Sequence, residues 1–207
     1  MLPAASAANA DFRRVRRSTI SGHLTRTILT ALAVVYTGRM LTDLVQIRLL
    51  GEKKRNENEK FRRFMKAHDH SDRILRRVAE EIEDQIDCTQ CANCCRVATA
   101  TVTERDIEHL ARYLRLTPAR FEADYTEVSA EEGRVLLRTK EAGCVFLDGN
   151  ECTVYDARPD SCQKFPHVVR GAGSIASRMW QFADRACYCP IVYNSLEAFK
   201  KELGFRY

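Results

Sequence analysis

The sequence predicts an α+β protein that is mostly helical, with N-terminal helices followed by a small cysteine-rich domain containing a short β-hairpin. All nine cysteines of the 207-residue chain lie after residue 87, and the residues just before them follow a helical hydrophobic spacing. Hydrophobic residues make up 45% of the chain and charged residues 29%. This balance is ordinary for a globular protein with a modest core.

Residues 1–40 form the first of three regions, a basic extension. Six arginines precede Asp43, and only Asp11 opposes them. Such a segment suits a solvated tail, which need not be ordered, better than a surface for nucleic acid or an anionic membrane. Its best apolar run, residues 28–36, is too short to span a bilayer. We therefore expect neither nucleic acid nor a membrane as a partner.

Residues 41–87 form the second region, a helical lead-in. Ser71 or Asp72 is expected to cap a helix that runs toward the first cysteine. The apolar side chains of this helix recur at three- and four-residue spacing, at Ile74, Leu75, Val78, Ile82 and Ile86. His68-Asp69-His70, just before it, looks like a metal-binding tripeptide. In a charged linker next to a helix cap, however, we expect a solvated turn.

Residues 88–207 form the third region, the cysteine-cluster domain. Two helices are expected in its first part. Thr103 and Asp106 have the spacing of a capping box, with Asp in place of the usual Glu. Thr117-Pro118 suits the start of a second helix, because proline is well tolerated at the first helical position. Local capping chemistry thus predicts where both helices begin.

Short strands and a last helix are expected farther along. Residues 134–140 are typical of a short strand. The sequence CVFLDGNECTVY indicates a hairpin with Asp148-Gly149-Asn150 at its turn, and the two arms would bring its two cysteines close together. A final helix is expected to be capped by Asn194 or Ser195 and to end at Gly204.

Four thiols lie within eight residues, at Cys88, Cys91, Cys94 and Cys95. In a C-x2-C-x2-C sequence the two-residue spacers let thiolates converge on one ion, as in zinc sites and iron–sulfur clusters. Neighbouring side chains diverge, so Cys94 and Cys95 are poorly placed to share one metal. We therefore expect this doublet to serve two nearby metal positions.

The other five cysteines supply enough thiols for two four-thiolate sites with one left over; they are Cys144, Cys152, Cys162, Cys187 and Cys189. An odd total argues against a closed disulfide framework, and the chain starts without a secretory pattern. We therefore expect a reducing, cytoplasmic setting, in which clustered thiols indicate a metal-centred domain.

The first cluster, followed by FLDGNEC, YDARPDSC and a final Cys-Pro, resembles the YkgJ-like cysteine-cluster family, with its CxxCxxCC motif. Members are described as carrying a zinc- or iron-chelating domain. The resemblance covers about residues 86–192 and implies eight metal ligands, with Cys187 left out: Cys88, Cys91, Cys94, Cys95, Cys144, Cys152, Cys162 and Cys189. A glycine common in the family between the second and third cysteines is replaced here by Ala92-Asn93.

The same resemblance includes a Tyr-x-x-Arg-Pro element, matched here by Tyr155, Arg158 and Pro159. Pro159 would fix the turn that presents Cys162. Arg158 would pair with a carboxylate or offset the cluster's charge, because four thiolates on one divalent zinc leave a net charge of about −2.

We predict a cytoplasmic protein that chelates zinc or iron, or an iron–sulfur cluster, through clustered cysteine thiolates. Two alternatives stay open: an iron-dependent redox or oxidative enzyme that uses the same cluster, and a zinc-stabilised module for protein interaction. The chain has no glycine-rich phosphate loop, no G-x-S-x-G and no H-E-x-x-H sequence, so no catalytic residue is assigned. The single tryptophan, Trp180, is expected in the core.

Overall fold

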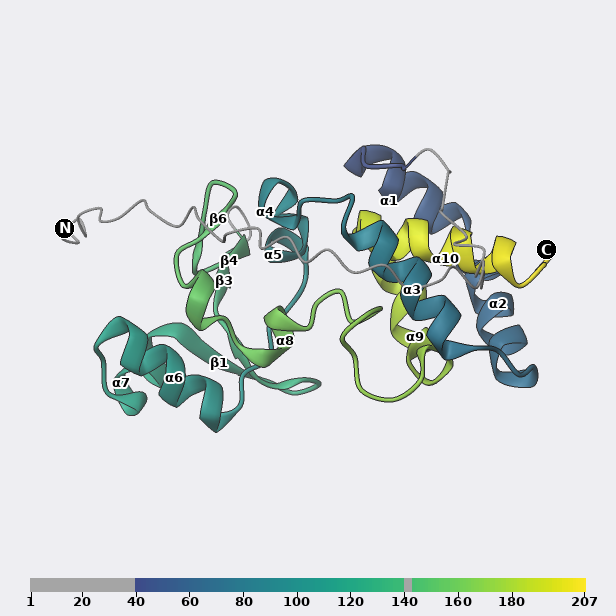
Figure 1. The fold of residues 1–207 in the computed structure, drawn as a ribbon. Coiled ribbons are helices and arrows are strands. Elements are labelled where there is room, and N and C mark those ends of the chain that lie inside the picture. Colours follow the sequence, from purple (N-terminus) through teal and green to yellow (C-terminus); the bar gives the residue numbers. More distant parts are fainter. Residues whose placement is uncertain (1–39, 140–142) are drawn as a thin grey trace, which may run out of the picture. The chain divides into compact units, whose positions relative to one another are not determined.

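The computed structural model describes residues 40–139 and 143–207, and most of the expected basic extension, residues 1–39, lies outside this range. The described residues form a series of helices and three small two-stranded antiparallel sheets (Figure 1). Helices come first, the small sheets lie in the cysteine-rich part, and further helices follow the sheets. The mostly helical α+β class is therefore confirmed.

Between residues 40 and 87, three helices precede the cysteines: α1 (Leu44–Lys53), α2 (Arg55–Ala67) and α3 (Asp72–Glu83). Asp43 caps α1, because its carboxylate accepts a hydrogen bond from the Gln46 N–H at 2.8 Å. Ser71 lies at the N-cap of α3, but its side chain makes no capping bond there. The predicted start of this helix is thus confirmed by position rather than by the expected capping contact.

Four further helices run through the first cysteines and beyond: α4 (Cys88–Cys91), α5 (Asn93–Val97), α6 (Glu104–Leu114) and α7 (Pro118–Tyr125). The capping box before α6 is present, since Thr103 N–H donates to the Asp106 carboxylate at 2.9 Å and Asp106 N–H donates back to Thr103 Oγ1 at 3.2 Å. Thr117 Oγ1 accepts from the Arg120 N–H at 3.3 Å at the start of α7. Both predicted helix starts are confirmed.

The strands pair in chain order; they are β1 (Thr126–Ser129), β2 (Gly133–Leu136), β3 (Arg138–Thr139), β4 (Gly143–Cys144), β5 (Leu147–Asp148) and β6 (Glu151–Cys152). Asp148 pairs with Glu151, so the hairpin turns at Gly149-Asn150 as predicted. Its arms are shorter than expected. Cys144 lies outside this hairpin, because it pairs with Arg138 of β3.

The chain continues through a 3₁₀ turn, η1 (Tyr155–Ala157), and the helices α8 (Asp160–Gln163), α9 (Ile175–Arg185) and α10 (Pro190–Glu202). The last helix begins earlier than predicted, because Cys189 is its N-cap and Pro190 its first residue. Asn194 and Ser195 are instead buried inside the helix. Asn194 bonds to the backbone of Leu41 in both directions, with its Nδ2 donating at 2.8 Å and its Oδ1 accepting at 3.0 Å.

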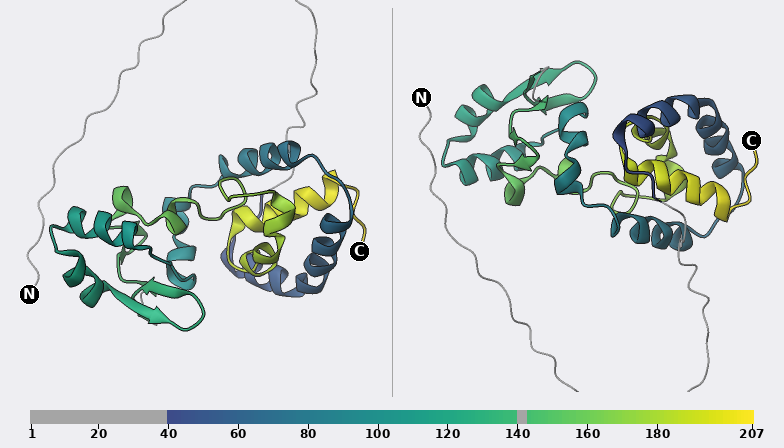
Figure 2. Two further views of the ribbon diagram at one scale, coloured as in Figure 1. Left: turned by 90° about the horizontal axis from the view of Figure 1, so that it is seen from below. Right: turned by 90° about the horizontal axis from the view of Figure 1, so that it is seen from above.

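Two apolar clusters form the interior of the described residues. The larger, which we call the helical core, joins α1, α2 and α3 to α9 and α10, with Phe61, Phe182 and Phe199 fully buried. Helices α3 and α10 lie side by side, as do α2 and α9 (Figure 2). This core combines residues from both sides of residue 88, and the predicted domain boundary there stays a prediction.

The second cluster, which we call the small core, lies among α6, α7 and the short strands. It includes Leu110, Phe121 and Phe146, and Cys144 and Cys152 pack against it. The helical core also includes a cysteine, because Cys189 is one of its buried members. Both cores are therefore in contact with thiols.

Trp180 contradicts its predicted place in the core. It lies on the outer side of α9 and is 65% exposed, while its neighbours Arg178 and Met179 are buried. One tryptophan cannot show from sequence alone which face of a helix is buried, and its burial depended on which face of α9 packs against α2.

Among the helices of residues 40–139 and 143–207, none is long and apolar enough to cross a membrane.

Candidate metal centre

Two short helices present the four clustered thiols. Asp87 caps α4, because its carboxylate accepts from the N–H and the hydroxyl of Thr89 at 2.9 and 2.6 Å. The single turn of α4 places Cys88 and Cys91 on one side of the helix.

Ala92 separates α4 from α5 by adopting the left-handed backbone region, with φ 47° and ψ 12°. This region costs an alanine free energy that glycine does not lose. The left-handed turn redirects the chain, so that Cys94 and Cys95 sit on a new helix.

A small cavity of about 20 Å³ is lined by four thiols, which we call the first thiol group: Cys88, Cys91, Cys94 and Cys189. The remaining walls are mostly apolar and include Ile86, Phe165 and Tyr188. Asn93 Nδ2 donates a 2.7 Å hydrogen bond to the Tyr188 carbonyl, which ties α5 to the segment before α10. This contact brings Cys189 to thiols almost a hundred residues earlier in the chain.

Burial dominates the electrostatics of this group. It raises the pKa of Cys88 to about 11 and that of Cys189 to about 12. Negative charge on Cys88 and Cys91 raises the pKa of Cys189 further, so these three sulfurs lie within electrostatic reach of one another. Glu83 and Asp87 also raise the pKa of Cys88, and Arg170 lowers it.

Three other thiols lie within electrostatic reach of Cys162, and together with it we call them the second thiol group: Cys95, Cys144, Cys152 and Cys162. Burial raises the pKa of Cys162 to about 12, and charge on the other three thiols raises it as well. Pro159 is the N-cap of α8, and the Cys162 N–H donates to its carbonyl at 2.9 Å.

Strand β4 approaches α5 very closely at this group. A Cβ on Gly143 would lie 2.5 Å from the Cys95 carbonyl oxygen and 2.7 Å from the Arg96 Cα. Gly143 also has φ +83°, a region that other residues rarely adopt. Only glycine at this position lets the strand bring Cys144 next to Cys95.

Three arginines surround the second thiol group, two of which the sequence analysis did not single out. Arg96 donates to the Gly149 carbonyl at 2.7 Å, and Arg138 donates to the Arg96 carbonyl at 2.6 Å. The Arg158 guanidinium stacks over the Tyr155 ring at 3.5 Å and donates to the Tyr155 carbonyl at 2.8 Å. Both Arg96 and Arg158 lower the pKa of Cys95, as expected for cations that offset thiolate charge.

The adjacent thiols of the doublet lie on the boundary between the two groups, with their Sγ atoms 4.0 Å apart. The hydrogen bond between them raises the pKa of Cys94 strongly and lowers that of Cys95 to about 6. Apart from its partner, Cys94 senses the charge of Cys189 and Cys88. Cys95 instead raises the pKa of the later thiols of its own group.

Cys187 lies outside both groups. It is buried, and its thiol donates weakly to the Ala183 carbonyl at 3.6 Å. Its charged neighbours are Arg55 and Glu52, at the junction of α1 and α2.

Four of the eight thiols line one cavity and the other four interact electrostatically, but among the described residues no group of three or more cysteine, histidine or acidic side chains is placed so that it could hold a metal ion. The donor type fits zinc or iron, because both metals bind thiolate sulfur readily. The division of the thiols into two groups shows one feature that the spacing of cysteines in the sequence could not predict. Cys189, remote in sequence, lies with the first thiols rather than with the later ones.

The comparisons with known proteins agree with this donor set. A search of curated proteins and a search of solved structures each found no match. The family model CxxCxxCC, described as a "Putative zinc- or iron-chelating domain", matches residues 87–190. The match spans half of the chain and begins and ends beside the first and last cysteines of the two groups. The chain therefore belongs to the CxxCxxCC family of zinc- or iron-chelating domains.

Proposed function

We propose that this protein is a cytoplasmic metal-binding protein that holds about two ions of zinc or iron, each by four thiolates. The first thiol group, Cys88, Cys91, Cys94 and Cys189, would hold one ion. The second, Cys95, Cys144, Cys152 and Cys162, would hold the other. The observation that supports this proposal is the division of the thiols at the doublet: Cys94 lines the cavity with Cys88, Cys91 and Cys189, whereas Cys95 does not line it and interacts electrostatically with the later thiols.

Several residues of the chain would support the bound ions. Arg96 and Arg158 offset part of the excess negative charge of the second group. The apolar walls of the cavity at the first group include Ile86 and Phe165, and of the four thiols there Cys189 is buried whereas Cys88 is exposed. A closed set of four protein ligands leaves no open coordination position, which favours chelation or structural use over catalysis.

The experiment is metal analysis of the full chain, purified without oxygen, with pairs of cysteines replaced by serine. We expect about two ions per parent chain and about one in C94S and in C95S. The pair C94S/C189S removes two ligands of one site and should still hold about one ion. The pair C94S/C162S removes a ligand from each site and should hold almost none.

C187S is the matched control, because Cys187 is buried but faces neither group. Its metal content should equal that of the parent. A parent with a single ion that is lost equally in C94S and C95S would refute the two-site assignment. So would equal metal contents in the two double variants, and circular dichroism of α-helix content shows that each variant has folded.

A further inference from the structure

A second place in the molecule contains metal-binding side chain types, and it contains no thiol. A cavity of about 360 Å³ lies where the end of α2, the linker to α3 and the start of α9 meet. Its polar lining includes Lys66, His68, Asp69, His70, Ser174 and Ser177. His68 and Asp69 are exposed, as expected for a solvated turn, but both histidines also line this cavity and His70 is only partly exposed.

The two imidazoles lie against the same aromatic ring. His68 is the C-cap of α2, and His70 follows it two residues later. Both rings stack on Phe64, with centroid distances of 4.3 Å for His68 and 6.1 Å for His70. The Phe64 ring therefore limits the orientations open to both histidines.

Hydrogen bonds to backbone carbonyls determine which ring nitrogens are free. His68 Nδ1 lies 2.9 Å from the Phe64 carbonyl oxygen, and His70 Nε2 lies 2.6 Å from that of Met65. A carbonyl oxygen can only accept, so these two nitrogens carry the protons. The lone pairs are left on His68 Nε2 and His70 Nδ1. A ring N–H donated to a backbone carbonyl is the supporting contact that metal-binding histidines usually make.

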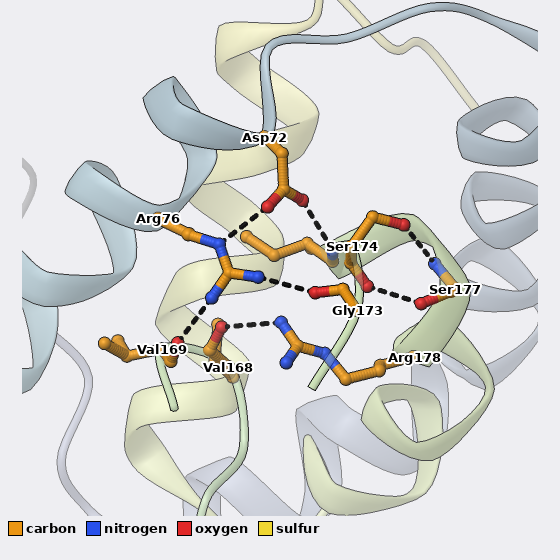
Figure 3. A network of polar contacts seen from close by, with 9 residues as sticks. Asp72, Arg76, Val168, Val169, Gly173, Ser174, Ser177 and Arg178 are labelled. Carbon is orange, nitrogen blue, oxygen red and sulfur yellow. Dashed lines mark hydrogen bonds and ion pairs between the residues drawn. The ribbon is translucent and has the colours of Figure 1, made fainter. Parts of the chain in front are cut away.

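The carboxylates at the cavity differ in their availability. Asp72 is fully engaged, since it accepts from Arg76 Nε at 2.6 Å and from the Ile175 N–H at 2.5 Å (Figure 3). Asp69 is exposed and makes no hydrogen bond or ion pair within residues 40–139 and 143–207. Lys66 also lines the cavity, but it is exposed and can keep its ammonium group in water.

The wall of the cavity formed by the start of α9 is also held in place by hydrogen bonds. Ser174 Oγ caps α9 by accepting from the Ser177 N–H at 3.2 Å, and Ser177 Oγ donates to the Ser174 carbonyl at 2.7 Å (Figure 3). Arg76 donates to the Val169 and Gly173 carbonyls at 2.7 and 2.6 Å. The cavity thus has a rigid wall on α9 and its only free carboxylate among the described residues, Asp69, on the linker.

We propose that His68 and His70, with Asp69, bind a divalent transition-metal ion in this cavity, at a site independent of the thiols. Imidazole nitrogen and carboxylate oxygen suit ions such as Ni²⁺, Co²⁺ and Zn²⁺. No group of three or more cysteine, histidine or acidic side chains among the described residues is already placed to hold a metal ion, so this site requires the Asp69 side chain to turn inward on binding and water to fill the remaining positions. This inference does not depend on how the thiol groups are assigned.

The test is calorimetric titration of the zinc-loaded full chain with Ni²⁺. We expect one added equivalent in the parent, and an affinity at least about tenfold lower in the double variant His68→Gln/His70→Asn. Asp69→Asn should weaken binding less, because both imidazoles remain. His109→Asn is the matched control, since His109 is exposed on α6 and does not line the cavity. Its Ni²⁺ affinity should equal that of the parent.

Two outcomes would overturn the proposal: no Ni²⁺ binding by the zinc-loaded parent, or equal affinities in the parent and the double variant. Zinc content measured in the same samples separates this site from the thiol groups, because loss of zinc would reveal displacement at sulfur. Repeating the titration with C94S/C95S provides a further check. Undiminished Ni²⁺ binding in that variant supports the histidine site, and its loss contradicts it.

Discussion

At the scale of single residues, Ala92 is the position where backbone conformation and residue type disagree. Its left-handed conformation is required to turn the chain between Cys91 and Cys94, yet an alanine there is strained by about 1–2 kcal/mol. Ala92→Gly should therefore raise the free energy of unfolding of the metal-loaded protein by roughly 0.5–1 kcal/mol, after the greater backbone entropy of glycine is subtracted. Denaturant unfolding measures this change.

The control is Ala98→Gly, since Ala98 ends α5 with an ordinary φ of −94°. Glycine there relieves no strain and should slightly lower the free energy of unfolding. A loss of stability in both variants would show that the strain at Ala92 is not real.

Gly143 provides a second prediction at this scale. Gly143→Ala would place a methyl group against the Cys95 carbonyl and the Arg96 Cα, and backbone atoms cannot move aside as a side chain can. We expect β4 to be displaced from α5 and the metal held by the second thiol group to be lost. Metal content per chain is the measurement.

Gly149→Ala is the matched variant, because Gly149 also has a positive φ, +58°, but a Cβ added there would meet no atom within 4 Å. It should keep its metal and lose only about 1 kcal/mol of stability from the backbone. Equal metal contents in the two glycine variants would rule out close packing as the reason for Gly143.

Features that depend on neighbouring residues were predictable at this scale. The capping box of Thr103 and Asp106 and the cap at Thr117 are made within four residues, so local sequence determines them. The exposure of Trp180 was not predictable, because it depends on which face of α9 packs on α2. The arginines around the second thiol group were equally hidden, since Arg96 and Arg138 come together only through strand pairing.

At the scale of elements, α10 is tied to α1 and α2 by charged side chains. Lys200 is nearly buried and lies 2.6 Å from Glu57 of α2 and 2.7 Å from Glu197 of α10. Lys54, between α1 and α2, also pairs with Glu197. Burial alone would raise the pKa of Glu197, but Lys200 and Lys54 lower it below its ordinary value of 4.5.

A lowered pKa in the folded state means that the Glu197 carboxylate stabilises the fold at neutral pH. This contribution is fully present above about pH 4.5 and is lost as the pH falls through the lower folded-state pKa. Glu197→Gln should therefore be less stable than the parent at neutral pH, and the difference should shrink on acidification. Thermal unfolding across that pH range tests this.

Glu202→Gln, at the exposed end of α10, is the control and should follow the parent at every pH. Comparing variant with parent at each pH cancels the release of metal from protonated thiols, which affects all three proteins alike. A stability difference for Glu197→Gln that stays constant with pH would contradict the ion-pair account.

Element boundaries were also predictable only where local sequence determines them, and not where tertiary contacts do. Helix α3 was predictable from the apolar stripe Ile74 to Ile82, whereas the start of α10 was not. Asn194 and Ser195 looked like caps, yet both are buried inside the helix, where Asn194 bonds to Leu41. A polar residue in a long-range contact has the same sequence signature as a cap, so only tertiary structure separates the two.

At the scale of the whole molecule, the two cores should respond differently to metal removal. The helical core buries Phe61, Phe182 and Phe199 without help from the clustered thiols, apart from Cys189. The small core has fewer members, and Cys144 and Cys152 pack on it directly. Structural zinc contributes on the order of 10 kcal/mol to folding, which a small apolar cluster cannot replace.

We therefore expect chelation to expose the amides of residues 88–163 to hydrogen exchange while those of α2, α3, α9 and α10 stay protected. Exchange measured by mass spectrometry, with and without chelator, tests this prediction. Readding zinc should restore protection and serves as the control for irreversible damage. Uniform loss of protection across both cores would show that the metal holds the whole chain together.

If each thiol group holds an ion, as proposed, the placement of Cys94 and Cys95 on one turn of α5 would link the occupancy of the two groups. An ion bound through Cys94 would restrain this helix and so present Cys95 to its own partners at a lower entropic cost. Such a linkage is reciprocal, so each ion raises the affinity for the other by the same factor. Loading would then be cooperative, with half-filled chains scarce, and the protein would respond to metal supply as a threshold rather than in proportion to it.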